Sequence, residues 1–182
     1  MRKELVRTSR FLSLVLRHDP AVVGIELDAS GWVDVEVLLQ ALAAHRSPIT
    51  RELLDEIVAT NDKRRFEMSA DARMIRAAQG HSLRVDLGLP PRTPPELLFH
   101  GTAERFLEAI LREGLLPGQR DHVHLSYDLH AAKQVGARHG RPVVLDVRAG
   151  AMASAGHAFY LSGNGVWLTP AVPPSFLSIV QE

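Results

Sequence analysis

Apolar residues in the first third of the chain recur every three or four positions, which is the spacing of an amphipathic helix. The apolar positions between residues 5 and 16 predict a first helix. It should end near Arg17 and His18, because Pro20 disfavours helical geometry in the residue before it. The pattern therefore places two basic side chains at the carboxyl end of a helix.

Two further helices are predicted, each preceded by a residue suited to cap its amino end. Asp34 precedes an apolar stripe over residues 35–42. Thr50 precedes a second stripe over residues 53–58, and Asn61 is a suitable terminator. The first part of the chain is therefore expected to be helical.

After these helices, the spacing of the apolar residues changes to that of short strands. Residues 65–68 and 73–77 form two predicted strands joined by a turn, with arginines interleaved among apolar residues. Helices followed by a basic hairpin are typical of a winged helix. We therefore expect residues 1–89 to form a winged-helix lobe.

Prolines mark the end of this lobe. Residues 90–96 contain four prolines, which forbid helix and favour a stiff, extended linker. Beyond it, residues 97–100 predict a buried strand, and Thr102 can cap a helix that Gly114 closes. Residues 129–138 predict one more helix, and strands are expected at residues 122–126, 142–147, 158–161, 166–169 and 176–180. The fold class is therefore α+β, with a second lobe over residues 97–182.

The composition excludes several kinds of chemistry. The 21 basic and 21 acidic residues balance, so contact with nucleic acid must come from local clusters of arginine and lysine. The absence of cysteine excludes disulfides and a cysteine nucleophile, and it fits a reducing cytoplasm. No stretch has the length or the apolar character of a membrane span or a signal peptide. We expect a cytoplasmic protein without a membrane partner, monomeric by default.

Arginines at the ends of predicted elements are the candidate anion-binding residues, because a guanidinium group can form two parallel hydrogen bonds to a phosphate. From the pattern alone, a solvated surface arginine is the plainer reading of each. The first of them, beside His18, could also complement a helix dipole. The candidates are Arg17, Arg65, Arg76 and Arg120.

Histidines and glycines supply the other candidate site residues. Residues 100–102, His-Gly-Thr, stand where a strand is expected to meet a helix, and a glycine there lets a ligand approach free backbone amides. A buried histidine satisfied by its neighbours is the plainer reading of His100. His122 and His124 share one face of a predicted strand, but no third ligand follows at comparable spacing, so we expect no metal site.

Taken together, six ordered motifs resemble the RNA 2′-phosphotransferase family, and the likeness runs from residue 12 to residue 177. Any one of the motifs could occur by chance, whereas their order along the chain is specific. They comprise residues 12–18, 61–66, 75–82, 100–102, 120–126 and 164–169.

The resemblance implies an RNA-binding winged-helix lobe and an NAD-binding lobe with the split β-sheet of ADP-ribosyltransferases. It implies NAD as co-substrate, no metal, and an RNA with an internal 2′-phosphate of the tRNA splice-junction type as substrate. In the implied first step the 2′-phosphate attacks the ribose carbon that bears nicotinamide. In the second step the neighbouring 2″-hydroxyl attacks phosphorus, which gives 2′-hydroxyl RNA and ADP-ribose 1″,2″-cyclic phosphate.

The motif matches also carry over residue roles. By resemblance the catalytic residues are Arg17, His18, Arg65 and Arg120. Arg65 is preferred to Arg64 because it directly precedes Phe66 in the family pattern, and Arg64 and Arg76 remain weaker candidates for RNA binding. The residues implied to contact NAD are His100, Gly101, Thr102, His124, Leu125, Ser126, Gly165 and Val166.

One departure from the wider ADP-ribosyltransferase superfamily favours phosphate as the acceptor. Where that superfamily usually carries a glutamate on a late strand, this chain has Val166. Without the carboxylate, activation of a neutral acceptor should be poor, while an already ionised phosphate remains a workable nucleophile. An alternative is an ADP-ribosyltransferase that caps terminal phosphates of RNA or DNA and stops after the first step. A winged-helix nucleic-acid-binding module without activity is disfavoured, because candidate residues occur in both halves.

Overall fold

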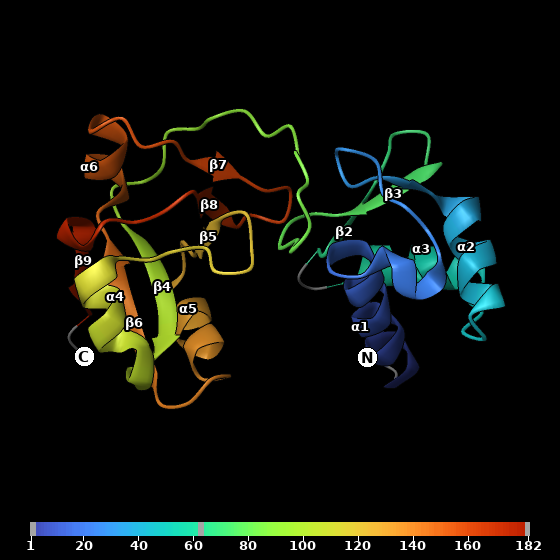
Figure 1. Ribbon diagram of the computed structural model, residues 1–182, viewed down its shortest axis with the longest axis horizontal. Coiled ribbons are helices and arrows are strands. Elements are labelled where there is room, and N and C mark those ends of the chain that lie inside the picture. Colours follow the sequence, from blue (N-terminus) through green and yellow to red (C-terminus); the bar gives the residue numbers. More distant parts are fainter. Residues whose placement is uncertain (1–2, 62–63, 181–182) are drawn as a thin grey trace. The chain divides into compact units, whose positions relative to one another are not determined.

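A computed structural model describes residues 3–61 and 64–180 of the chain (Figure 1). The second and third residues of the motif at 61–66 lie outside the described residues. The chain divides into two compact units, one ending at Gly88 and the other beginning at Leu89. Both units combine helices with small sheets, which confirms the α+β class.

The first unit contains the three expected helices and a small antiparallel sheet. Helices α1 (Lys3–Arg17), α2 (Val35–Ala44) and α3 (Arg51–Thr60) surround the core. The sheet has the order β1-β3-β2, and its strands are β1 (Val33–Asp34), β2 (Phe66–Met68) and β3 (Met74–Ala77). A short 3-10 helix, Pro20–Val23, follows α1. The expected hairpin is confirmed. Strand β1 was not expected, because two residues are too few to show the alternation of apolar and polar residues that marks a strand.

The predicted caps explain where α2 and α3 begin. The Asp34 carboxylate accepts hydrogen bonds from the backbone N–H groups of Glu36 and Val37, at 2.8 and 3.2 Å. The Thr50 hydroxyl accepts one from the backbone of Leu53 at 3.2 Å. Each cap satisfies amide groups that have no partner inside the helix, which is worth about 1 kcal/mol.

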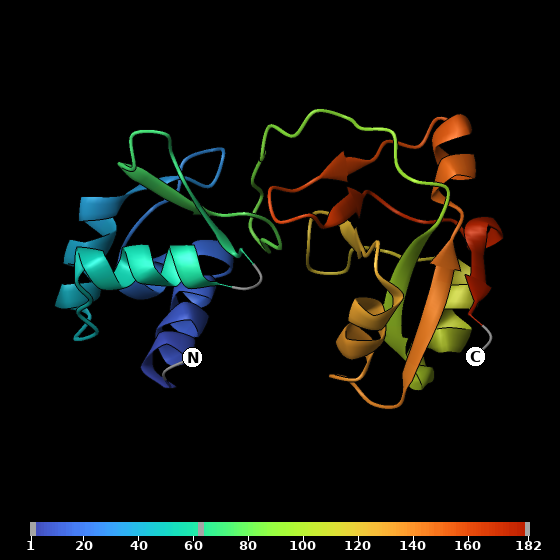
Figure 2. The same cartoon turned by 180° about the vertical axis from the view of Figure 1, so that it is seen from behind.

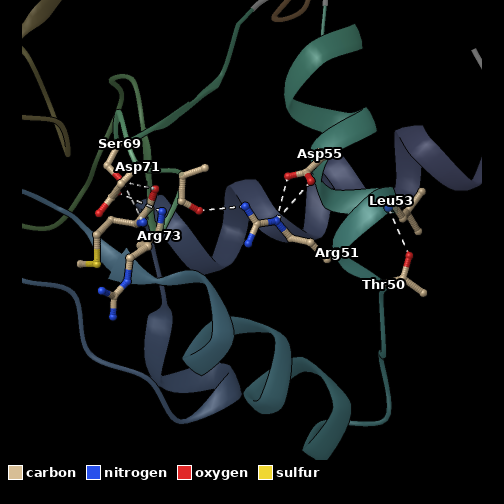
Figure 3. A network of polar contacts seen from close by, with 9 residues as sticks. Thr50, Arg51, Leu53, Asp55, Ser69, Asp71 and Arg73 are labelled. Carbon is tan, nitrogen blue, oxygen red and sulfur yellow. Dashed lines mark hydrogen bonds and ion pairs between the residues drawn. The ribbon is translucent and has the colours of Figure 1, made fainter.

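Arg51 ties α3 to the turn of the hairpin (Figure 3). Its Nε donates to Asp55 one turn along the helix at 3.0 Å, and its Nη2 donates to the carbonyl of Ala72 at 2.8 Å. Within the turn, the Ser69 hydroxyl donates to Asp71 at 2.6 Å. The hairpin is thereby held against α3, whose carboxyl end leads into β2.

The second unit contains two antiparallel sheets of three strands. One has the order β4-β6-β9, formed by β4 (Leu98–Ala103), β6 (Pro142–Val147) and β9 (Leu177–Ile179). The other has the order β5-β8-β7, formed by β5 (Val123–Leu125), β7 (Tyr160–Leu161) and β8 (Trp167–Thr169). A single bridge between Phe99 and Ser126 connects the two sheets. All the strands expected in this half are confirmed in place, within a few residues of their predicted bounds.

Helices cover the first of these sheets on both sides (Figures 1 and 2). Helix α5 (Leu129–Gly136) packs across β4 and β6, and α4 (Leu107–Glu113) lies on the opposite side. Gly114 ends α4 as expected, with φ of 86°. Helix α6 (Ala149–Ser154) was not expected, because six residues are too few to show the spacing of an amphipathic helix. Short 3-10 helices lie at Glu104–Phe106 and Pro174–Phe176.

The proline-rich segment belongs to the second unit and is extended. Pro91 forms an antiparallel bridge with Tyr160, and the backbone N–H of Arg92 donates to the carbonyl of Phe159 at 2.8 Å. Prolines suit this position, because an edge segment can leave some amide positions unpaired. Among the described helices, none has both the length and the apolar character needed to cross a membrane.

The structure corrects the expected role of residues 100–102. Thr102 does not cap a helix: β4 continues to Ala103, and a 3-10 turn precedes α4. Gly101 therefore lies inside a strand, paired with Val144. A Cβ atom built on Gly101 would lie 1.7 Å from the carbonyl oxygen of Ala132 in α5. The glycine is required there by the close approach of helix and strand.

We expect Gly101→Ala to lower the free energy of unfolding by about 3 kcal/mol, because the added methyl group meets backbone that cannot easily move. Urea denaturation without ligand measures this. The control is Gly156→Ala, where φ is 92° and nothing lies within 4 Å of the added atom, so that only backbone strain of about 1 kcal/mol is added. Equal losses in the two variants would contradict the packing argument.

Candidate functional site

The carboxyl end of α1 is joined to the start of β2. Arg17 is the last residue of α1, and its Nη2 donates to the carbonyl oxygen of Arg65 at 3.4 Å. The neighbouring His18 has its Nδ1 3.0 Å from the hydroxyl of Ser82, while the Ser82 backbone N–H donates to the carbonyl of Arg17 at 3.0 Å. The structure thus brings three of the expected site residues, Arg17, His18 and Arg65, into one region of the first unit.

The two neighbouring arginines of the motif at 61–66 differ in their surroundings. Arg65 is half-buried, and its Nη1 donates to the side-chain oxygen of Asn61 at 3.1 Å. Arg64 is exposed and has φ of 40°, an uncommon value for a residue with a side chain. Its backbone N–H closes a turn on the carbonyl of Asn61 at 2.7 Å. Arg65 is therefore the arginine whose side chain the fold holds in place.

Arg76 has partners of its own within the first unit. Its guanidinium lies 2.9 Å from the Glu67 carboxylate, directly across the β2–β3 pair, and 4.4 Å from the centre of the Trp32 ring. It also donates to the carbonyls of Ser30 and Leu87, each at 3.3 Å. These contacts give Arg76 a part in holding the fold, and a role in RNA binding stays a prediction.

Sequence reasoning assigned no role to His81, although it lies in the motif at 75–82. Its side chain is 3% exposed, and within the described residues its Nε2 has no hydrogen-bond partner. Burial, and after it the nearby positive charges of Arg17, Arg76 and His18, together lower the pKa of His81 from 6.5 to about 4. A neutral imidazole at this position adds no further charge to a cluster of cations.

The lowered pKa of His81 predicts acid sensitivity of the fold. The folded value of about 4 lies below the unfolded value of 6.5, so the unfolded chain binds more protons in between. His81 therefore contributes about 2 kcal/mol to the free energy of unfolding above pH 6.5. This contribution is lost as the pH falls from 6.5 toward 4. Urea denaturation between pH 7.5 and 4.5 should show a smaller loss of stability in His81→Gln than in the parent protein. If the parent protein and His81→Gln lose the same stability over this pH range, the lowered pKa of His81 is not the cause of the acid sensitivity.

In the second unit, β4, β5 and the loop before β5 bring His100, His124 and Arg120 together. The Nη1 of Arg120 lies 2.7 Å from Nδ1 of His124, and Nδ1 of His100 lies 3.1 Å from the carbonyl oxygen of His124. A guanidinium only donates and a carbonyl only accepts. His124 therefore accepts at Nδ1 and carries its proton on Nε2, while His100 carries its proton on Nδ1 and can accept at Nε2.

Burial away from water lowers the pKa values of both His100 and Arg120. Burial lowers the pKa of His100, and the nearby Arg120 lowers it further, so the ring is neutral near pH 7. Desolvation of the Arg120 guanidinium, with Arg138 close by, lowers the pKa of Arg120 as well. A cation that has lost part of its hydration gains more from a bound anion than a fully solvated one. Arg120 is thus suited to receive a phosphate.

The remaining residues expected to contact NAD lie in different settings. Thr102 and Leu125 are 7% and 1% exposed, so their side chains belong to the interior. The Ser126 hydroxyl donates to the carbonyl of Asp128 at 2.9 Å. Gly165, with φ of 80°, and Val166 form the turn between β7 and β8, where the Ser162 hydroxyl accepts from the Val166 backbone at 3.0 Å. His100, His124 and Ser126 are close neighbours through the bridge that joins the two sheets.

The expected face shared by His122 and His124 is occupied by ring contacts in the structure. His122 meets the ring of Tyr160 edge-on, with 5.5 Å between ring centres, and burial lowers its pKa. In the described part of the chain, no group of three or more histidine, cysteine or carboxylate side chains is arranged to hold a metal ion.

Comparison with known proteins defines the class. The family model described as RNA 2′-phosphotransferase, Tpt1 / KptA family, matches residues 3–171. Since this covers nearly all of both units, the chain belongs to the RNA 2′-phosphotransferase family.

Individual relatives are similar over almost their full length. A protein of Hahella chejuensis named probable RNA 2′-phosphotransferase is 57% identical over 181 residues, covering 100% of this chain and 97% of the relative. Proteins of the same name from Agrobacterium fabrum and Acaryochloris marina are 58% and 49% identical, covering 96% and 100% of this chain and 94% and 100% of the relatives.

Proposed function

We propose that this chain removes an internal 2′-phosphate from RNA by transferring it to NAD. Its membership of the RNA 2′-phosphotransferase family supports phosphate transfer. The observation that carries the use of NAD is the pair of histidine tautomers in the second unit. His100 presents an acceptor, and His124 carries a proton at the corresponding ring nitrogen. One donor and one acceptor suit the two hydroxyls of a ribose, because a hydroxyl can both accept and donate.

In the first unit, Arg17 and Arg65 are proposed to bind the 2′-phosphate of the RNA. Both guanidinium groups donate to neutral oxygens, a backbone carbonyl and an amide. A neutral acceptor orients a guanidinium without cancelling its charge. We assign His18, held by Ser82, to orienting the phosphate or to proton transfer at the attacking hydroxyl.

In the second unit, Arg120 is proposed to stabilise charge on phosphorus, while His124 holds its guanidinium through a neutral contact at 2.7 Å. The other proposed NAD contacts are Gly101, Thr102, Leu125, Ser126, Gly165 and Val166. Thr102 and Leu125 would contribute through the backbone, because their side chains are buried. Arg64 and Arg76 are kept as secondary RNA contacts.

These residue types fit the proposed chemistry. A phosphate monoester is ionised near neutral pH, so the attack on the ribose carbon needs positioning and charge management more than a base. The release of phosphate from RNA then gathers negative charge around phosphorus, which preorganised guanidinium groups stabilise without a metal. Val166, where a carboxylate would activate a neutral acceptor, agrees with this choice of nucleophile.

Several broader assignments belong to the same proposal. We infer that residues 1–89 act as a winged-helix RNA-binding lobe and residues 97–182 as an ADP-ribosyltransferase-like lobe. The arrangement of helices, hairpin and two bridged sheets supports these fold names. A spliced tRNA is the proposed kind of substrate, and a cytoplasmic monomer the proposed state.

The proposal is tested by incubating RNA that bears one internal 2′-phosphate with NAD and the protein. We expect 2′-hydroxyl RNA, nicotinamide and ADP-ribose 1″,2″-cyclic phosphate to appear together. Consumption of NAD with the phosphate still on the RNA would favour the alternative that caps phosphates and stops after the first step. If neither RNA nor NAD changes, the protein is a nucleic-acid-binding module, and the proposal is wrong.

Arg65→Ala or Arg120→Ala should slow the second step by about 100-fold or more, because each removes a charge that stabilises the phosphorus centre. The expected sign is accumulation of ADP-ribosylated RNA, resolved by gel electrophoresis. Arg112→Ala is the matched control, since that arginine is exposed and pairs with Glu113 at 2.6 Å. Full turnover by both site variants would refute their assignment.

A further inference from the structure

Two buried polar side chains, Ser9 and Asn61, lie beneath Arg65. Each is 7% exposed, and Asn61 Nδ2 donates to the Ser9 hydroxyl at 3.1 Å. They come from α1 and from the residue that ends α3, 52 positions apart in sequence. Removing one member of such a pair costs about 1–3 kcal/mol, because the other is left buried without its bond. Two aliphatic residues would fill the same space without this risk, so the pair calls for an explanation beyond packing.

The explanation lies in the direction of the Asn61 amide. Its oxygen accepts from Nη1 of Arg65 at 3.1 Å, while its nitrogen faces Ser9. If the amide were turned over, its NH₂ group would face the guanidinium, and two donors would meet. The guanidinium, which can only donate, therefore requires the amide oxygen on its side. The Ser9 hydroxyl accepts from the amide nitrogen and holds the Asn61 side chain in place beside Arg65.

The same residues line a shallow pocket of the first unit. Its wall includes Ser9, Arg10, Asn61 and Arg65, and its remaining lining is Leu5, Val6, Ile57 and Thr60. Arg65 therefore has open space beside it, and its contact with Asn61 restricts the rotamers that it takes up there. Fixing a long side chain in advance removes an entropy cost of up to about 2 kcal/mol from ligand binding.

We propose that Asn61, anchored by Ser9, is a positioning residue that keeps the Arg65 guanidinium directed for binding the RNA 2′-phosphate. This rests on the proposed function, in which Arg65 contacts that phosphate. Asn61 itself does not touch the substrate and acts through Arg65 alone. Neutral Asn61 performs this task better than a carboxylate would, because a carboxylate would compete with the phosphate for the same positive charge.

The kinetic test compares Asn61→Ala with the parent protein on 2′-phosphorylated RNA. We expect the rate of phosphate removal to fall by about 10- to 100-fold, the usual effect of a misplaced catalytic group. In an Arg65→Ala background, Asn61→Ala should have little further effect, since the group through which it acts is gone. Equal losses in the two backgrounds would overturn the proposal.

Two further variants separate positioning from stability. Ser9→Ala should lower the rate less than Asn61→Ala, because the amide keeps its contact with Arg65 but loses the bond that anchors its nitrogen. The matched control is Ser13→Ala, which removes a bond of 2.8 Å to the Ser9 carbonyl within α1. Ser13→Ala should leave the rate unchanged at a similar thermal midpoint. A rate loss in Ser13→Ala as large as that in Ser9→Ala would refute the specific role of the pair.

Asn61→Asp distinguishes geometry from charge. The carboxylate can accept from both Arg65 and the Ser9 hydroxyl, so the position of Arg65 is kept while its charge is partly neutralised. We expect a raised KM for phosphorylated RNA that increases further at high salt, with kcat closer to the parent value than that of Asn61→Ala. If Asn61→Asp and Asn61→Ala share the same low kcat, orientation by Asn61 is not what supports the rate.

A measurement without substrate keeps this inference separate from the proposed function. Nitrogen-15 NMR of the arginine side chains reports rotation of the Arg65 guanidinium about its Nε–Cζ bond. We expect slow rotation in the parent protein and fast rotation in Asn61→Ala, with Arg51 as an internal reference. If the parent protein transfers no phosphate, the proposed function fails, whereas fast Arg65 rotation in the parent would overturn the positioning proposal by itself.

Discussion

One backbone carbonyl, that of Arg65, joins the elements on which the first unit's candidate site depends. It accepts from the backbone N–H of Ala78 at 2.9 Å and from Nη2 of Arg17 at 3.4 Å. A carbonyl oxygen has two lone pairs, so the hairpin and the end of α1 can share it. Arg17 and the start of β2 are therefore fixed relative to one another. This arrangement brings several positive charges close together, so they repel one another. Because His81 is neutral, it adds nothing to that repulsion.

The protein uses its charged groups in two ways. Carboxylates hold arginines that fasten elements together, as Glu67 does for Arg76 and Asp55 for Arg51. Two candidate site residues have neutral acceptors among their contacts: an amide oxygen for Arg65 and an imidazole nitrogen for Arg120. Such acceptors direct a guanidinium and preserve its charge, which is what recognition of a phosphate requires. Arginines with a neutral acceptor occur in both units.

Local signals in the sequence predicted much of the fold. Caps at Asp34 and Thr50 and the proline at position 20 placed the three helices of the first unit, because each acts on neighbouring backbone only. The same reasoning failed at Thr102, where a hydroxyl suited to capping lies inside a strand. Pairing of β4 with β6 along six residues outweighs a single capping bond. The spacing of apolar residues also could not predict β1 or α6, because both elements are too short to show a regular spacing.

The sequence by itself determined the class of protein, the helical first half and the strand-rich second half, because motif order and local propensity can be read from neighbouring residues. It also supplied most of the residues proposed for the candidate site. Only the tertiary structure decided why Gly101 must be glycine, which tautomers His100 and His124 adopt, and that Asn61 and Ser9 support Arg65. These features depend on groups far apart in sequence that approach within a few ångströms. Spacing along a chain carries no record of such contacts, since they arise from packing.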